Sequence, residues 1–217
     1  MYKLKATNYF FKCVLVIFLS LNTTVLLAQK IVGSGAQSAG FRFSNDETVT
    51  QLIIHYQQNI QMLSGIDDRP ALKIYGSGRV VVHYPVYMKK AGDYEMQLEA
   101  AELVDLIQSL SGNGVLDFDE ARVKKNIQSY KKALHAKGRF YEVSDAVVTS
   151  IDVRLDEYQK NRAAVKIKDF HKAFHLANIE HAAKQFKQDI DITKANNAVL
   201  GLKGLMKDAR LVKKERR

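Results

Sequence analysis

Strict alternation of apolar and polar residues predicts an antiparallel strand over residues 147–155. The odd-numbered positions of this segment are Val, Thr, Ile, Val and Leu, whereas Asp152 and Arg154 lie between them. A period of two residues is typical of a strand that buries one face. The later segment 163–174 fits either a strand or a helix, and we interpret it as a strand that pairs with 147–155.

The segment 71–85, ALKIYGSGRVVVHYP, predicts a β-hairpin. Two runs of β-branched and aromatic residues flank Gly76 and Gly78. Glycine adopts the positive φ angles of tight hairpin turns without steric strain. We therefore expect Gly76 and Gly78 to be structural turn residues. A β-branched run predicts another strand over 48–56, and Val86 to Tyr94 is expected to be an irregular return.

Apolar residues three and four positions apart predict a helix over 99–110, and an acidic start with a lysine-rich end predicts a second one over 119–137. Asn178 is placed to cap a short helix, and Asp191 or Thr193 to cap a last one. Hairpins followed by helices predict an α+β fold: a small antiparallel sheet built from hairpins, with helices packed on one face and helices at the C-terminus.

The first 28 residues have the layout of a secretory signal peptide. Lysines precede an apolar stretch that starts at Cys13, and the segment ends with a small residue, Ala28, before Gln29. We expect cleavage near Ala28 and a periplasmic or secreted protein. Cleavage removes the chain's one cysteine, so the mature protein has no disulfide, which favours a bacterial origin.

The predicted organisation is a signal peptide over 1–28, a flexible Gly/Ser/Ala-containing spacer over 29–46, a single α+β domain over 47–209 and a basic tail over 210–217. With 217 residues, of which 47% are hydrophobic, the chain is large enough for a stable core without disulfides. No transmembrane span is expected once the signal peptide is removed.

The block LKIYGSGRV from Leu72 to Val80 is followed by Gly92-Asp93-Tyr94 and Glu102-Leu103. This order resembles exported bacterial proteins of unknown function, in which an I-Y-G-x-G hairpin precedes a G-x-Y strand and an E-L-x-x-L helix. The stretch from Ser144 to Tyr158 fits the same kind of protein. The resemblance implies a shared fold and export from the cytoplasm, and it implies no activity.

Charge is distributed unevenly along the mature chain. Residues 29–117 contain 7 Lys+Arg and 10 Asp+Glu, net −3, whereas residues 118–217 contain 23 and 13, net +10. A basic half attracts acidic surfaces at long range. We therefore expect any partner to be an anionic envelope component or an acidic protein, bound through 118–217, and we expect no specific nucleic acid.

Two groups of side chains are candidate sites. Aromatic and basic residues near the predicted hairpin could stack on a ligand such as a sugar; this group consists of Tyr75, Tyr84, Tyr87, Lys89 and Lys90. The second group, His171, His175 and His181, is a weak candidate for a metal site, because two members face the same way. The HExxH motif is absent and lysines lie between these histidines, so we predict no metal and no cofactor.

No catalytic signature such as GxSxG is present, so the catalytic residues are unknown and enzymatic activity is not favoured. The sequence predicts an exported bacterial protein that acts as a non-enzymatic binding or interaction module of the cell envelope. The alternative is an exported hydrolase with a dispersed, His-based site.

Overall fold

The computed structural model describes residues 40–44, 51–60, 69–141 and 146–215. The predicted signal peptide over 1–28 lies outside these ranges. Among the described residues, no helix has the length and apolar character needed to cross a membrane.

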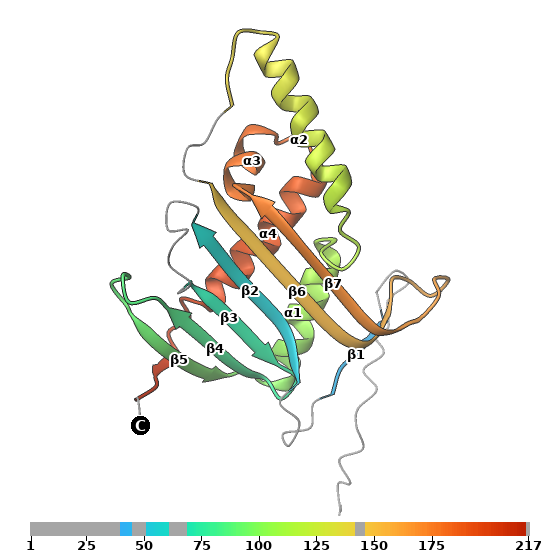
Figure 1. The fold of residues 1–217 in the computed structure, drawn as a ribbon. Helices are drawn as coiled ribbons and strands as arrows, with labels where there is room; N and C mark the ends of the chain where they lie inside the picture. The colour runs from blue at the N-terminus through green and yellow to red at the C-terminus, as the bar shows by residue number, and fades with distance from the viewer. Residues whose placement is uncertain (1–39, 45–50, 61–68, 142–145, 216–217) are drawn as a thin grey trace, which may run out of the picture.

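One antiparallel sheet of eight strands forms the framework (Figure 1). The strands are β1 (Gly40–Arg42), β2 (Leu52–Ile60), β3 (Ala71–Tyr75), β4 (Arg79–Tyr84), β5 (Gly92–Gln97), β6 (Val147–Gln159), β7 (Ile167–Ala177) and β8 (Val212–Lys213). Their order is β1-β6-β2-β3-β4-β5-β8, and β7 also pairs with β6. Strand β7 therefore forms one edge of the sheet, and the short β8 covers part of β5 at the other edge.

The central strand β6 is the longest, and several others pair with it. Residues 147–153 of β6 pair with β2, residues 157–159 pair with β1, and β7 pairs along residues 148–158. The interpretation of 163–174 as a strand partner of 147–155 is therefore confirmed, although β7 starts and ends a few residues later. Thr149, Ile151, Val153 and Leu155 are buried, as the alternation predicts, and Val147 is half-buried.

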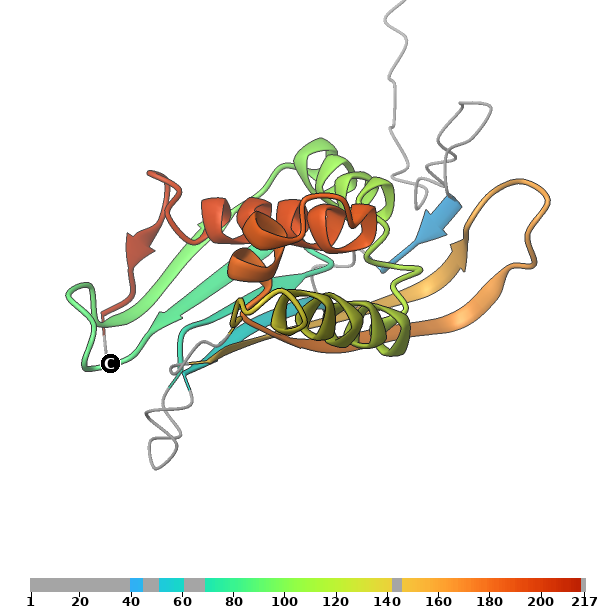
Figure 2. The ribbon, with the colours of Figure 1, turned by 90° about the horizontal axis from the view of Figure 1, so that it is seen from above.

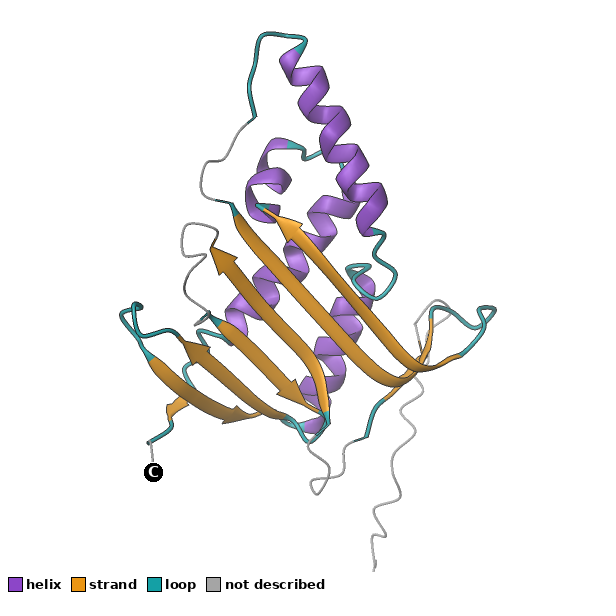
Figure 3. Cartoon of the chain, in the orientation of Figure 1, coloured by secondary structure: helices purple, strands orange, loops and turns teal. Residues whose placement is uncertain are grey.

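In the residue ranges given above, four helices pack on one face of the sheet and none packs on the other (Figures 2 and 3). They are α1 (Ala100–Gly112), α2 (Glu120–His135), α3 (Ile179–Gln185) and α4 (Ile190–Leu205). The predicted α+β class with two C-terminal helices is confirmed. The core lies between the layers, where, for example, the Phe118 and Phe174 ring centroids are 4.4 Å apart. Full burial of each such side chain stabilises the fold by about 1.5–3 kcal/mol.

The start of α4 differs from the prediction. Neither Asp191 nor Thr193 caps this helix; the Oδ1 atom of Asp189 accepts a hydrogen bond from the Ile192 amide at 3.0 Å. Asp189 is buried, and its other oxygen accepts hydrogen bonds from Asn126 at 2.9 Å and Tyr130 at 3.2 Å. The tertiary contacts with α2 therefore fix where α4 begins.

The sheet extends beyond the predicted hairpins. Strand β2 begins at Leu52 and runs four residues past the predicted end at Tyr56. The expected irregular return contains the start of β5, which pairs with β4 from Gly92 onward. Strands β1 and β8 lie within the ranges predicted to be a spacer and a tail.

The predicted turn joins β3 to β4, and its two glycines are needed for different reasons. Gly78 has a φ of +85°, and a Cβ there would lie 2.4 Å from the Leu98 carbonyl oxygen. Gly76 does not have a positive φ, but a Cβ there would lie 1.8 Å from the Ser44 carbonyl oxygen. Both glycines lie between β3 and β4, and the reason for glycine at Gly76 is close backbone approach rather than a positive φ.

Candidate functional site

The face of the sheet opposite the helices, here called the open face, carries most of the histidines. Four of the six in the sequence project from it: His55 on β2, His83 on β4, and His171 and His175 on β7. Their neighbours along each strand, such as Tyr56, Val82 and Phe174, are buried beneath the helices. Alternation along the strands therefore collects titratable side chains on one surface.

Asp152 on β6 is the centre of one polar cluster on the open face. Its Oδ2 atom accepts a hydrogen bond from His171 Nε2 at 2.9 Å, and its Oδ1 atom accepts one from Arg154 Nε at 3.1 Å. Partial burial disfavours the charged carboxylate, but these two hydrogen bonds outweigh it and hold the pKa of Asp152 below its usual range. The carboxylate therefore stays ionised to unusually low pH.

His55 lies beside this cluster, directly opposite Asp152 in the pairing of β2 with β6. Burial, followed by the positive charge of Lys73, lowers the pKa of the His55 imidazole, and the Asp152 carboxylate only partly offsets this. His55 is therefore held in the neutral form.

A serine–histidine pair lies on the same face. Ser150 Oγ is 2.7 Å from His175 Nδ1, and the His175 backbone amide donates to the Glu120 carboxylate at 2.9 Å. A hydrogen bond between a serine hydroxyl and an imidazole is the contact that joins nucleophile and base in hydrolases of the serine type. The nearby Asp152 contacts His171 rather than His175, so a Ser-His-Asp triad is not formed.

The three histidines considered as weak candidates for metal ligands do not converge. His171 and His175 point the same way on β7 but have separate partners, Asp152 and Ser150. His181 is on α3 and packs on Tyr141, with ring centroids 5.0 Å apart. Across the described residues, no group of three or more His, Cys, Asp or Glu side chains is arranged to hold a metal ion.

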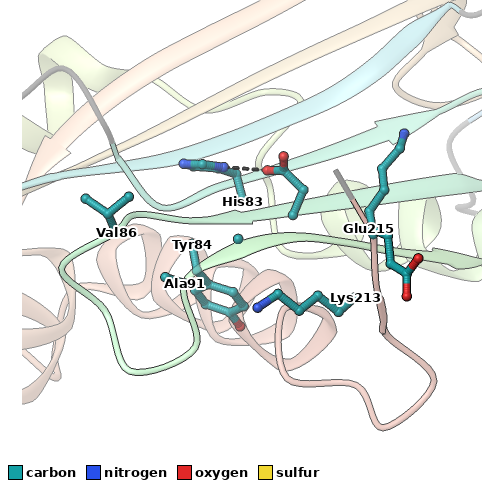
Figure 4. Close-up of a pocket in the computed structure, with 9 residues that line it drawn as sticks. His83, Tyr84, Val86, Ala91, Lys213 and Glu215 are labelled. Atoms are coloured by element: carbon teal, nitrogen blue, oxygen red, sulfur yellow. Dashed lines mark hydrogen bonds and ion pairs between the residues drawn. The ribbon is translucent and has the colours of Figure 1, made fainter. Parts of the chain in front are cut away.

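A shallow depression lies further along the open face, over β3, β4 and β5. It is lined by Ala71, Lys73, Val81, His83 and Asp93. His83 Nδ1 and Asp93 Oδ1 are 2.5 Å apart (Figure 4). A second hollow shares these two residues and continues around the sheet margin to Tyr84 and Lys213. Figure 4 shows that Tyr84 and Lys213 lie on the opposite side of the strands from His83.

The predicted tyrosine and lysine candidates are therefore only partly brought together. Tyr84 faces the helices, where its hydroxyl donates to the Met206 carbonyl oxygen. Tyr87, Lys89 and Lys90 lie exposed in the β4–β5 loop next to it. Tyr75 is at the far end of β3, where Arg79 covers its ring at 4.2 Å from the centroid. The five residues do not form one pocket.

Nine of the 23 cations of residues 118–217 lie on two elements that adjoin opposite ends of the edge strand β7 (Figure 1). One is α2, whose cations include Arg122, Lys124, Lys125, Lys131 and Lys132. The other consists of the loop that joins β6 to β7 and the first two residues of β7, here called the hairpin tip (residues 160–168). It contains Lys160, Arg162, Lys166 and Lys168 and no acidic residue. We refer to the two elements together as the basic flank.

Sequence reasoning gave no role to His55 or Ser150 and did not connect Asp152 with a histidine. The alternation that predicts β6 also places Ser150 and Asp152 on its polar face. The sequence could therefore have shown that these two side chains share a face. Their histidine partners depend on the register between β6 and β7, which alternation does not determine.

Comparisons with protein-family models, curated proteins and solved structures find none that matches this chain. The resemblance to exported bacterial proteins therefore stays a prediction, and the functional argument depends on the geometry described above.

Proposed function

We propose that this chain is an exported bacterial binding module of the cell envelope, without catalytic activity, which attaches to an anionic partner through the basic flank. The observation that carries the proposal is the presence of five cations on α2 and four on the hairpin tip, the two elements that adjoin the ends of the edge strand β7. Long-range attraction by such a cluster raises the rate of encounter with a polyanion.

Several of these cations are available for a partner. Lys160 Nζ lies 3.6 Å from Asp117 Oδ2 and Lys166 Nζ lies 3.1 Å from Glu157 Oε1, but both lysine side chains remain more than half exposed. Within the described part of the chain, no ion pair involves Arg162, Lys168, Lys125 or Lys132. Exposed pairs contribute only about 0–1 kcal/mol each, so a polyanion can replace them at little cost.

The test uses the mature chain starting at Gln29 and three probes: phosphatidylglycerol vesicles, lipopolysaccharide and polyglutamate. Binding to at least one probe should weaken steeply as salt rises, because exposed charges are screened over about 8 Å at physiological ionic strength. At a fixed salt concentration, replacing Lys124, Lys125, Lys131 and Lys132 together by Gln should weaken binding relative to the wild type, whereas single replacements should have small effects. Salt-independent binding, or no binding to any probe, would contradict the proposal.

A hydrolase is the second candidate, and the Ser150–His175 contact of 2.7 Å is the observation that favours it. A fluorophosphonate probe labels serines whose hydroxyl is activated by a base. Labelling that disappears in Ser150→Ala and in His175→Gln would support hydrolysis over simple binding. We expect no labelling, because the carboxylate that would orient this base contacts His171 instead.

A further inference from the structure

We infer that the hairpin tip inserts into the surface of an anionic lipid bilayer. This inference rests on the proposed function and goes beyond it, because it names the partner and adds an apolar contact to the electrostatic one. Its basis is the coincidence, at one protruding tip, of exposed apolar side chains and a cluster of cations.

The tip protrudes from the body of the protein. The loop between β6 and β7 extends past the end of the sheet in both views (Figures 1 and 2). At this tip, Val165 is 84% exposed and Ile167 is 49% exposed. Val165 is the most exposed large apolar side chain of the described residues. Two exposed apolar side chains on one protruding tip can bury their apolar surface by entering the headgroup region of a bilayer.

The tip is held in shape by its own polar side chains. Asn161 Oδ1 accepts hydrogen bonds from the Ala163 amide at 3.0 Å and the Ala164 amide at 2.9 Å. The Gln159 side chain donates to the Ala164 carbonyl oxygen at 2.8 Å. A preformed loop loses little conformational freedom when it binds, so more of the contact energy appears as affinity.

Cations flank the apolar side chains in the sequence. The segment from Lys160 to Lys168 contains four cations and no acidic residue. Each lysine or arginine close to an anionic leaflet strengthens binding by roughly five-fold, and the attraction disappears within a Debye length. Apolar side chains flanked by cations are the combination that enters the headgroup region of such a leaflet.

A bilayer fits this tip better than an acidic protein does. A protein surface would need a complementary pocket for Val165 at the end of a protruding hairpin. A bilayer accepts an apolar side chain at any lateral position, and its anionic headgroups surround the cations at the same time.

Insertion can be measured directly, because the sequence contains no tryptophan. Val165→Trp places one reporter at the tip. On vesicles of equal parts phosphatidylglycerol and phosphatidylcholine, its emission should shift to the blue and be quenched by brominated acyl chains. The matched control is Phe140→Trp, at a residue that is 75% exposed just beyond α2, and its emission should not change.

Three binding variants separate the contributions. Val165→Ser combined with Ile167→Ser should weaken vesicle binding about ten-fold and leave the salt dependence unchanged. Lys160, Arg162, Lys166 and Lys168 replaced by Gln should weaken it by roughly several hundred-fold, because four effects of about five-fold each multiply. The charge-matched set on α2, Lys124, Lys125, Lys131 and Lys132 to Gln, should weaken it less.

The outcomes distinguish this inference from the proposed function. If the Val165→Trp variant binds vesicles without a blue shift of its emission, or if the serine pair has no effect, insertion is wrong while anionic binding stands. Salt-sensitive binding to polyglutamate with no binding to vesicles identifies an acidic protein as the partner and overturns the inference. Binding to none of the probes contradicts both.

Discussion

Asp152 and His171 form a hydrogen bond of 2.9 Å that joins the edge strand β7 to β6 across the open face. The pair lies at diagonal positions of the two strands, since Asp152 is opposite Ala173 and Arg154 is opposite His171. Because the contact stabilises the charged carboxylate, it makes the stability of the fold depend on pH.

The first prediction concerns this pH dependence. The pKa of Asp152 is lowered from its ordinary value of 3.8 in the folded protein. The unfolded chain therefore takes up a proton first, and the stabilisation is complete above the ordinary pKa and lost as pH falls through the folded one. Asp152→Asn should be less stable than the wild type at pH 6, and the difference should shrink towards pH 3. Urea unfolding over this range measures it, and a difference that is independent of pH would contradict it.

The second prediction compares two buried tyrosines. The Tyr56 hydroxyl is buried without a hydrogen-bond partner among the described residues, whereas Tyr158 donates to Asp117 at 2.9 Å. Tyr56→Phe should be neutral or stabilise the fold by up to about 1 kcal/mol, because it removes an unsatisfied polar group. Tyr158→Phe should cost about 1 kcal/mol. Thermal and urea unfolding of the two variants test this, and equal losses would show that Tyr56 has a partner.

The third prediction separates capping from tertiary contact in two aspartates. Asp119 and Asp189 both accept the amide three residues later, at 2.9 and 3.0 Å. Asp189 is buried and also accepts hydrogen bonds from two side chains of another helix, α2, whereas Asp119 is exposed. Asp119→Ala should cost about 1 kcal/mol for the lost cap, whereas Asp189→Ala should cost roughly 2–4 kcal/mol because Asn126 and Tyr130 also lose their acceptor. Similar losses of unfolding free energy in the two variants, measured with urea, would mean that the buried contacts of Asp189 do not contribute to stability.

The fourth prediction concerns the β3–β4 turn. Gly78→Val should destabilise by more than about 1 kcal/mol, because it puts a β-branched residue at positive φ and forces a Cβ against the Leu98 carbonyl. Gly76→Ala should also destabilise, through the Ser44 carbonyl oxygen. Gly112→Ala is the control, because a Cβ there has open space. Melting temperatures that match the wild type at both turn positions would contradict the assignment.

Local patterns predicted those parts of the fold that depend on neighbouring residues. Alternation along 147–155 and the glycines between β3 and β4 identified strands and a turn correctly. Strand β8 was missed, because it has only two residues and pairs with a segment more than a hundred positions earlier. Asp189 was missed as a cap because its choice over Asp191 depends on Asn126 and Tyr130, which lie on another helix.

The candidate site was less predictable than the fold. The cations of α2 and the hairpin tip can be read from the sequence, but the position of these two elements at the ends of β7 follows from the sheet topology. The tyrosines near the hairpin were grouped by their closeness in sequence. Tyr75 and Tyr84 lie at opposite ends of strand β4, so these two residues are far apart in space although they are close in the sequence.

The position of β2 between β3 and β6 has a consequence for how the chain folds during synthesis. One neighbour of β2 follows it almost at once, but the other begins at Val147, about ninety residues later. Until β6 emerges, the long strand β2 has an unpaired edge, and the apolar side chains of β2–β5 lack part of their cover. Closing so long a loop is slow, and an uncovered edge is a site for aggregation. We therefore expect nascent chains that end before Val147 to need a chaperone, and the cooperative fold to form only once β6 and β7 have been made.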